Sequence, residues 1–164
     1  MKKVILFCCL LVFVSMFIPL AEAEQYINGC PVPDNLKVTE PDSNTVPPKL
    51  TLLSGIWEGS WTTSAIFIVE QIKGNEAVVV YAWAGSNSMG RAHSTASYNP
   101  GFVRQKCPIE QGDDGKYRII CTLKTGINKL IQTNDPRQIR VVREGFAQMR
   151  PESRDTIFMK KEMK

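Results

Sequence analysis

From position 55 onward the chain is a series of short segments rich in Val, Ile, Phe, Trp and Tyr, separated by turn-forming residues. The separators include Lys73-Gly74-Asn75, Asn99-Pro100-Gly101 and Asn134-Asp135-Pro136. Such runs are typical of β-strands, and no strong helical period competes with them. The expected strands are 55–61, 65–72, 77–84, 92–98, 103–109, 117–123, 127–132, 138–143 and 156–160. This spacing predicts an all-β domain, either an antiparallel sandwich or a barrel.

Two of these segments, 65–72 and 77–84, are apolar on both faces of the strand. In 65–72, for example, Phe67 and Ile68 point to opposite faces, because side chains alternate along a strand. An antiparallel strand with two apolar faces must be covered on both sides. Either the preceding arm, residues 24–50, or a protein partner is expected to supply the outer cover.

The first residues predict export. Met1-Lys2-Lys3 precedes an apolar run that ends at Leu20, and Ala21-Glu22-Ala23 follows it. A basic start, an apolar run and small residues at a cleavage site are the three parts of a secretory signal peptide. We therefore predict a signal peptide over 1–23 and a mature protein in the bacterial periplasm or outside the cell, with a retained membrane anchor as the alternative. No membrane span is expected after cleavage.

The remaining chain is expected to consist of the arm, 24–50, and one domain, 51–164. Five prolines restrict the arm and remove backbone donors, so it is expected to be extended and irregular: Pro31, Pro33, Pro41, Pro47 and Pro48. The net charge of the whole chain is +4, and its basic residues are scattered. Because nucleic-acid binding needs a basic stripe or patch, no nucleic-acid partner is expected.

Three cysteines follow the predicted cleavage site. Folding the chain about the turn Gly112-Asp113-Asp114-Gly115 places Cys107 opposite Cys121. Cross-strand neighbours lie close enough for a bridge, so we predict a Cys107–Cys121 disulfide, with two buried free thiols as the alternative. Cys30 is left over, and three states are open to it: a free thiol, a bond to another molecule, or competition for one of the other two cysteines.

The motif Gly55-x-Trp57-x-Gly59-x-Trp61 opens the first expected strand. Trp57 in this position can plug the closed end of a barrel with a large aromatic surface, and the glycines allow close approach of neighbouring chain. The functional alternative is that Trp61, on the same face, lines a pocket and stacks on a ligand.

This motif resembles the Gly-x-Trp signature of the calycin superfamily, which includes lipocalins, fatty-acid-binding proteins and avidins. Together with Val69-Glu70 and the run from Val79 to Trp83, it is similar to small lipocalin-like bacterial domains of unassigned function. The resemblance implies an antiparallel up-and-down β-barrel of about eight strands over 51–164. It also implies an internal cavity.

The other residues that could take part in catalysis are better explained by structural roles. Ser88 lies in a loosened nucleophile elbow, five residues before His93, but the elbow requires a strand-to-helix turn and the neighbours here are strands. Glu58 and Glu70 fall in strands and are expected to face solvent. No phosphate loop, dinucleotide fingerprint or metal-ligand spacing occurs. We therefore predict no enzymatic activity, no cofactor and no metal site.

Two functions remain in competition. The first is an exported, non-enzymatic barrel that binds a small apolar or amphipathic ligand in its cavity. The predicted lining residues are Trp61, Phe67, Val79, Tyr81 and Trp83. The second is a protein-interaction module, such as an inhibitor or an envelope- or host-directed secreted protein, whose barrel is filled by its own side chains. The proline-rich arm, Cys30 and the doubly apolar strands support the second.

Overall fold

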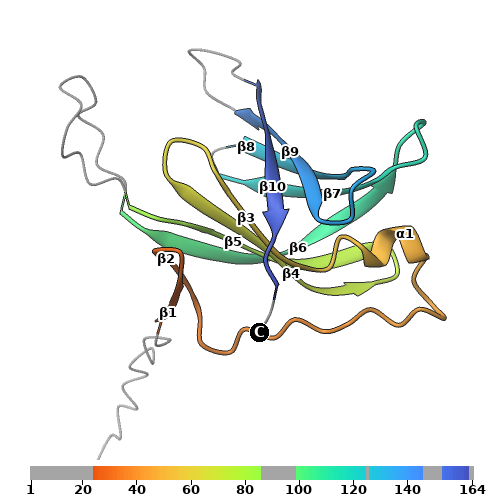
Figure 1. Cartoon of the computed structure of the whole chain (residues 1–164), viewed down its shortest axis with the longest axis horizontal. Helices are drawn as coiled ribbons and strands as arrows, with labels where there is room; N and C mark the ends of the chain where they lie inside the picture. The colour runs from red at the N-terminus through yellow and green to blue at the C-terminus, as the bar shows by residue number, and fades with distance from the viewer. Residues whose placement is uncertain (1–23, 86–98, 125, 146–152, 163–164) are drawn as a thin grey trace, which may run out of the picture.

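The computed structural model describes residues 24–85, 99–124, 126–145 and 153–162. Eight strands of these residues close into one antiparallel barrel, in the order β10-β3-β4-β5-β6-β7-β8-β9 (Figure 1). Each strand pairs with its neighbours in the sequence, and β10 returns to β3 to close the wall. The predicted all-β, up-and-down barrel is therefore confirmed.

The barrel strands are β3 (Gly55–Ser60), β4 (Ser64–Lys73), β5 (Glu76–Trp83), β6 (Gly101–Gln111), β7 (Tyr117–Leu123), β8 (Gly126–Gln132), β9 (Gln138–Gly145) and β10 (Ser153–Lys160). They correspond to eight of the predicted segments. The other predicted strand, 92–98, and the predicted signal peptide, 1–23, lie outside the described residues.

The arm begins with a hairpin that the sequence analysis did not predict. Strands β1 (Glu24–Ile27) and β2 (Cys30–Pro33) pair antiparallel, with Ile27 opposite Cys30. Asn28 and Gly29 join them with φ of 49° and 75°. Two positive φ values in a two-residue connection match the right-handed twist of the paired strands, and Asn-Gly is the sequence that adopts them most readily. The arm is thus extended, as predicted, but residues 24–33 are not irregular.

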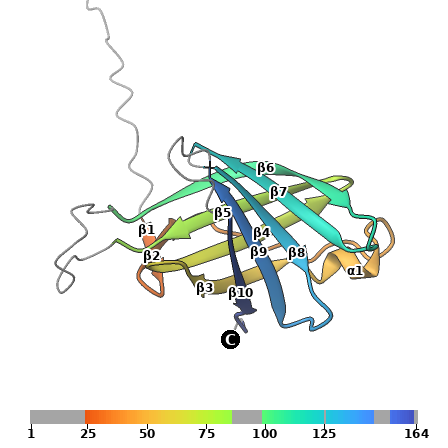
Figure 2. The same cartoon turned by 90° about the horizontal axis from the view of Figure 1, so that it is seen from above.

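After β2 the arm runs along the outside of the barrel to α1 (Pro48–Thr51), as the orange trace in Figure 1 shows. Strand β2 lies against β4, β5 and β6. Figure 2 gives the same arrangement from above, with α1 at one end of the barrel. Of the two covers expected for the doubly apolar strands, the arm is therefore the one found.

Two apolar cores result, one on each side of this part of the wall. The outer layer lies between the arm and the barrel and contains Cys30, Val32, Ile56, Ile66, Ile68, Val80 and Ala82. The inner core fills the barrel. Its largest fully buried side chains are Trp57, Phe67, Phe158, Leu53, Ile119, Leu130 and Ile139.

Candidate functional site

Trp57 closes the end of the barrel at which α1 lies, here called the α1 end. Its side chain is 1% exposed, and its Nε1 donates a hydrogen bond of 2.9 Å to the carbonyl oxygen of Leu53. The ammonium of Lys160 lies 5.1 Å from the centre of the indole ring, a cation–π contact. Leu50 of α1 packs in the same core. The first tryptophan of the motif is therefore a plug, as predicted.

Gly59 explains the second glycine of the motif. A Cβ atom at this position would lie 2.6 Å from the ring of Phe158 on β10. The ring therefore packs directly on bare backbone, which only glycine permits. This contact helps to bring β3 and β10 together at the closure of the barrel.

A continuous run of aromatic rings crosses the interior. The pairs Trp61–Phe158, Phe158–Phe67, Phe67–Tyr81 and Tyr81–Trp83 have ring-centroid distances of 5.7, 5.3, 4.6 and 5.5 Å. These distances are within the range of favourable aromatic pairs. We call these five residues the aromatic run. It joins the buried centre of the barrel to Trp61 and Trp83, which are only partly buried.

The end of the barrel opposite α1, here called the Trp83 end, carries the partly buried tryptophans Trp61 and Trp83. Along β5 the inward-facing side chains become more exposed toward this end, from Val79 at 1% through Tyr81 at 6% to the half-buried Trp83. Other inward-facing residues near this end are also only partly buried: Trp61, Val103, Gln105, Leu123 and Arg143. Partly buried inward-facing residues also lie toward the α1 end, namely Ile109, Tyr117 and Gln132, so the feature that distinguishes the Trp83 end is its two partly buried tryptophans.

The five predicted ligand residues therefore fall into two groups. Phe67 and Val79 lie within the packed inner core, where they support other side chains. Tyr81 lies between the two groups. Trp61 and Trp83 lie at the partly exposed edge of the core, where a ligand can reach them. All five belong to one connected interior, as the alternation along the strands predicted.

Two hollows lined by described residues lie elsewhere. One of about 430 Å³ opens on the outside of the barrel, between the β1–β2 turn and the β3–β10 closure, and is bordered by Asn28, Glu58 and Ile157. A crevice beside Trp57 at the α1 end has no room for a water molecule. None of the five predicted ligand residues borders either hollow. The hollow of about 430 Å³ therefore lies on the outside of the barrel and is not the predicted internal cavity.

The predicted cysteine pair is confirmed. The Sγ atoms of Cys107 on β6 and Cys121 on β7 are 2.11 Å apart, with their Cα atoms 4.9 Å apart. The register places Ile109 opposite Ile119, and two residues further along each strand the cysteines face each other. Cys30 is a free thiol that is 0% exposed, and burial raises its pKa.

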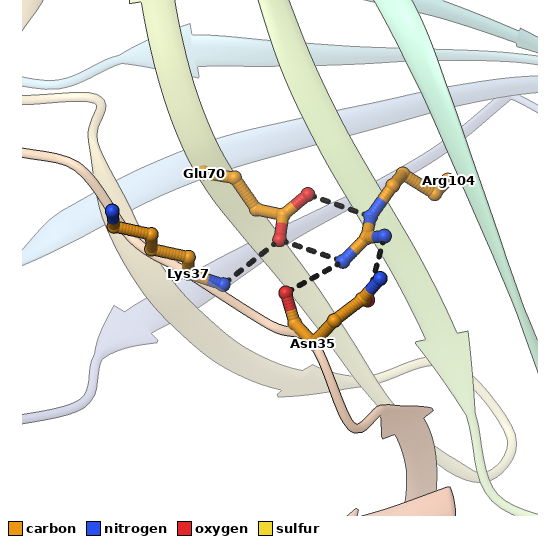
Figure 3. Close-up of polar contacts among 4 residues, drawn as sticks. All are labelled: Asn35, Lys37, Glu70 and Arg104. Atoms are coloured by element: carbon orange, nitrogen blue, oxygen red, sulfur yellow. Dashed lines mark hydrogen bonds and ion pairs between the residues drawn. The ribbon is translucent and has the colours of Figure 1, made fainter. Parts of the chain in front are cut away.

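Glu70 does not face solvent, and the prediction that it does is wrong. It is 6% exposed. Its Oε2 lies 2.8 Å from Nε of Arg104 on β6, and its Oε1 accepts hydrogen bonds from Nη2 of Arg104 and from the backbone N–H of Lys37 (Figure 3). Arg104 also donates to Oδ1 of Asn35 at 2.8 Å. This network ties the arm to the outer surface of β4 and β6.

Glu58 is partly buried, and its Oε1 lies 2.5 Å from Nζ of Lys161. Ser88 and His93, the candidate catalytic pair, lie outside the described residues. Within the described part of the chain, no group of three or more His, Cys, Asp and Glu side chains could hold a metal ion. No helix in that part is long and apolar enough to cross a membrane.

Two further interior residues were not singled out from the sequence. Asn128 on β8 is 0% exposed, and Arg143 on β9 lies opposite it in the register. Each lies two residues from a core residue of its own strand, Asn128 from Leu130 and Arg143 from Val141, and therefore faces the interior. Sequence reasoning could have found them, because each is a polar residue at a position of 127–132 or 138–143 where the alternation predicts an apolar, inward-facing one.

The chain matches no protein-family model, and no curated protein and no solved structure matches it.

Proposed function

We propose that the protein is an exported, non-enzymatic barrel that binds a small amphipathic molecule at its Trp83 end. The observation that carries this proposal is the pair of partly buried tryptophans at the Trp83 end. The α1 end is sealed by Trp57, whereas the aromatic run reaches the half-buried Trp61 and Trp83 at the other end. A ligand that covers a partly exposed aromatic side chain removes apolar surface from water, which favours binding.

The polar groups near this surface support an amphipathic rather than a purely apolar ligand. Burial raises the pKa of the Tyr81 hydroxyl in the interior, and the positive charge of Arg143 counteracts part of this rise. Binding sites for small molecules typically combine an apolar lining with a few polar groups that fix orientation. Trp61 and Trp83 would contact the apolar part of the ligand, and Tyr81 and Arg143 its polar part.

Export is supported by two independent features. The pattern of the first 23 residues is that of a signal peptide, and the Cys107–Cys121 pair lies at disulfide distance, as is usual in oxidising compartments. The mass of the protein recovered from a secreting host tests cleavage after Ala23. A protein that retains its first 23 residues would contradict this part of the proposal.

A protein-interaction role is the second candidate, and the outer face of β10 favours it. Ile157 and Met159 are 45% and 48% exposed there and border the outer hollow. The doubly apolar strands no longer support it, because the arm covers their outer face.

Titration with N-phenyl-1-naphthylamine, an uncharged fluorescent probe of apolar sites, tests ligand binding at the Trp83 end. We expect probe emission to rise and tryptophan emission to fall as the probe binds. Trp61→Phe and Trp83→Phe should weaken this response, whereas Trp57→Phe at the sealed end should leave it unchanged. A response that survives both changes but disappears in an Ile157→Ser, Met159→Ser variant would place the site on β10 and overturn the proposal.

A further inference from the structure

Strand β10 is paired along the whole of one edge and along only a short part of the other. It pairs with β9 over seven residues, from Ser153 to Met159. Its pairing with β3 covers only Met159 and Lys160. Continuing this register would place Ile157 opposite Ser60, the last residue of β3. The first half of β10 therefore extends past the end of β3, and no described strand pairs with it on that side (Figure 1).

The hydrogen bonds at the end of β10 show which of its backbone groups face each neighbour. The N–H of Lys160 donates to the carbonyl oxygen of Arg137, just before β9, and the N–H of Lys161 donates to that of Ile56 on β3. Along an antiparallel strand this direction alternates from one residue to the next. Even-numbered residues of β10 therefore bond toward β9, and odd-numbered residues face the side of β3.

Asp155 and Ile157 are the residues whose backbone groups face the open part of this edge. No ladder pairing among the described residues reaches them on the β3 side. Unpaired N–H and C=O groups along a strand edge are a template for a further extended backbone. β10 contains no proline, which would remove such a donor. The edge can therefore accept an extended segment as an additional strand.

The outer hollow lies beside this open edge. It has a volume of about 430 Å³ and is bordered by Gly59 and Ser60 of β3 and by Thr156, Ile157 and Met159 of β10. Hollows of roughly 300–1,000 Å³ can hold a small ligand, and hence a side chain. A segment paired with β10 would direct every second side chain to the outer face of the barrel. The hollow lies where such a side chain would enter.

The residues around the hollow favour an apolar side chain. Ile157 and Met159 are 45% and 48% exposed on its β10 side, and a methionine side chain adapts readily to the shape of a partner. Glu58 also borders the hollow, but its carboxylate is paired with Lys161 at 2.5 Å. Because this charge is compensated within the chain, the hollow does not require a charged group from a partner.

We infer that the open edge of β10 binds an extended apolar segment of a partner protein by strand addition, with one side chain of the segment in the outer hollow. This inference rests on the second candidate function, protein interaction, and is independent of ligand binding at the Trp83 end. A small molecule can fill the hollow but cannot pair with the backbone of Asp155 and Ile157, whereas an extended peptide does both. The expected segment has apolar residues at every second position and no proline between them.

Selection from a phage-displayed library of random peptides tests the inference on the purified protein. The peptides are about ten residues long, which is the length of a long strand. We expect the enriched peptides to show the alternation of apolar residues and the lack of proline. Fluorescein-labelled synthetic copies are then titrated with the protein, and fluorescence anisotropy gives their dissociation constants.

Methylation of the peptide backbone identifies strand addition. Methyl groups on every second backbone nitrogen block one edge of an extended peptide and leave its side chains unchanged. Only one edge of the bound peptide pairs with β10. One of the two possible sets of methyl groups should therefore weaken binding at least about tenfold, because several hydrogen bonds are lost, and the other set should have little effect.

Variants of β10 locate the contact on the protein. Asp155→Pro removes a donor from the open edge and leaves the hydrogen bonds of the even-numbered residues to β9, so it should weaken binding at least about tenfold. Asp155→Asn is the matched control, because it also removes the carboxylate but keeps the N–H, and it should bind as the parent does. The Ile157→Ser, Met159→Ser variant keeps the edge but loses the apolar side of the hollow and should also bind more weakly. Urea unfolding checks that each variant is folded.

The outcomes separate this inference from ligand binding at the Trp83 end. A selection that yields no binding peptide would overturn it, as would binding that neither alternate methylation nor the Ile157→Ser, Met159→Ser variant weakens. Dimerisation of the parent that Asp155→Pro abolishes would show that a second copy of the chain occupies the edge, which also contradicts the inference. Peptide binding by a protein that does not bind the naphthylamine probe would support strand addition and overturn the ligand-binding function alone.

Discussion

The outer surface of the barrel is built differently on β4 and on β10. On β4, Ile66 and Ile68 are 0% exposed, because the arm packs over them. On β10, Ile157 and Met159 are 45% and 48% exposed. Only β3 separates these strands in the closed wall. The position of the arm, rather than the barrel itself, therefore decides whether an outward-facing apolar residue is structural or free for contact.

This difference bears on the choice between the two candidate functions. An apolar outer face could have indicated a partner surface on β4 and β5, but the chain itself covers that face with Val32 and Cys30. The polar network of Glu70 and Arg104 then holds the arm in place. On β10, Ile157 and Met159 remain exposed, so a protein partner can contact them. The following predictions test how strongly the two surfaces differ.

The largest expected effect comes from the same substitution made on both strands. Ile68→Ala should lower the free energy of unfolding by about 2–5 kcal/mol, since it leaves a cavity in a fully buried layer. Ile157→Ala should change it by less than about 0.5 kcal/mol, as is usual for exposed positions. Urea unfolding followed by circular dichroism measures both. Equal losses in the two variants would show that β10 is covered in solution.

The next largest effect is expected at the ion pair under the arm. Glu70→Gln keeps the shape of the side chain but removes the charge that Arg104 and the Lys37 backbone contact. Hydrogen bonds to charged groups contribute about 1.5–3 kcal/mol, so we expect a loss in that range. Glu76→Gln is the matched control, because the Glu76–Lys106 pair is exposed and 3.6 Å long. It should cost less than about 1 kcal/mol.

A smaller loss is expected at Cys30. Its Sγ lies 3.4 Å from the carbonyl oxygen of Ser64 within the outer layer. Cys30→Ser places a more polar group there but can keep this hydrogen bond, so we expect a loss of about 1–2 kcal/mol. In the parent protein the thiol should resist alkylation until the arm opens, which mass spectrometry detects. Rapid alkylation of the folded protein would show that the arm is not closed over β4.

Much of the fold was predictable, because it depends on local patterns. Turn residues and β-rich runs located eight strands, and the turn at Asp113-Asp114 placed Cys107 opposite Cys121. The Asn28-Gly29 turn was equally readable as a hairpin signal, but the prolines around it favoured an irregular arm. Local pattern alone therefore predicts strands and hairpins well where the signals agree.

Glu70 shows where local patterns fail. Glu70 lies at a bulge, where the pairing of β4 with β5 shifts in register between Val69 and Gln71, and it faces outward, where the arm covers it. Its partner Arg104 lies 34 residues away. Neither a bulge nor a distant ion partner is visible in the sequence of a single strand.

The candidate site was predictable only in part, for a similar reason. Alternation placed Trp61, Tyr81 and Trp83 inside the barrel, as found. The burial of Phe67 depends on its contacts with Tyr81 of β5 and Phe158 of β10. Alternation shows only which face of its strand a side chain occupies, and not which side chains of other strands cover it. The pairing of Asn128 with Arg143 depends on the register of β8 and β9, which the sequence of neither strand shows.

The smallest expected effect is at the Arg140–Asp155 ion pair, on the uncovered side of the barrel. Both side chains are about half exposed, at 52% and 45%. The guanidinium of Arg140 donates hydrogen bonds to Asp155 and holds the pKa of its carboxyl below the ordinary value. An exposed pair of this kind typically contributes less than about 1 kcal/mol, so Asp155→Asn should cost no more than that at neutral pH.

The pH dependence of this cost follows from the lowered pKa of Asp155. The contribution of the pair is present above the ordinary Asp pKa of about 3.9 and is lost as the pH falls through the lower value in the folded protein. Asp155→Asn and the parent should therefore converge in stability in strongly acidic solution, as measured by urea unfolding at several pH values. Salt at about 1 M should also remove the difference, because exposed charges are screened, while the cost of Ile68→Ala persists. A loss above about 2 kcal/mol that salt does not reduce would mean that Asp155 is buried in solution, and the contrast between β4 and β10 would not hold.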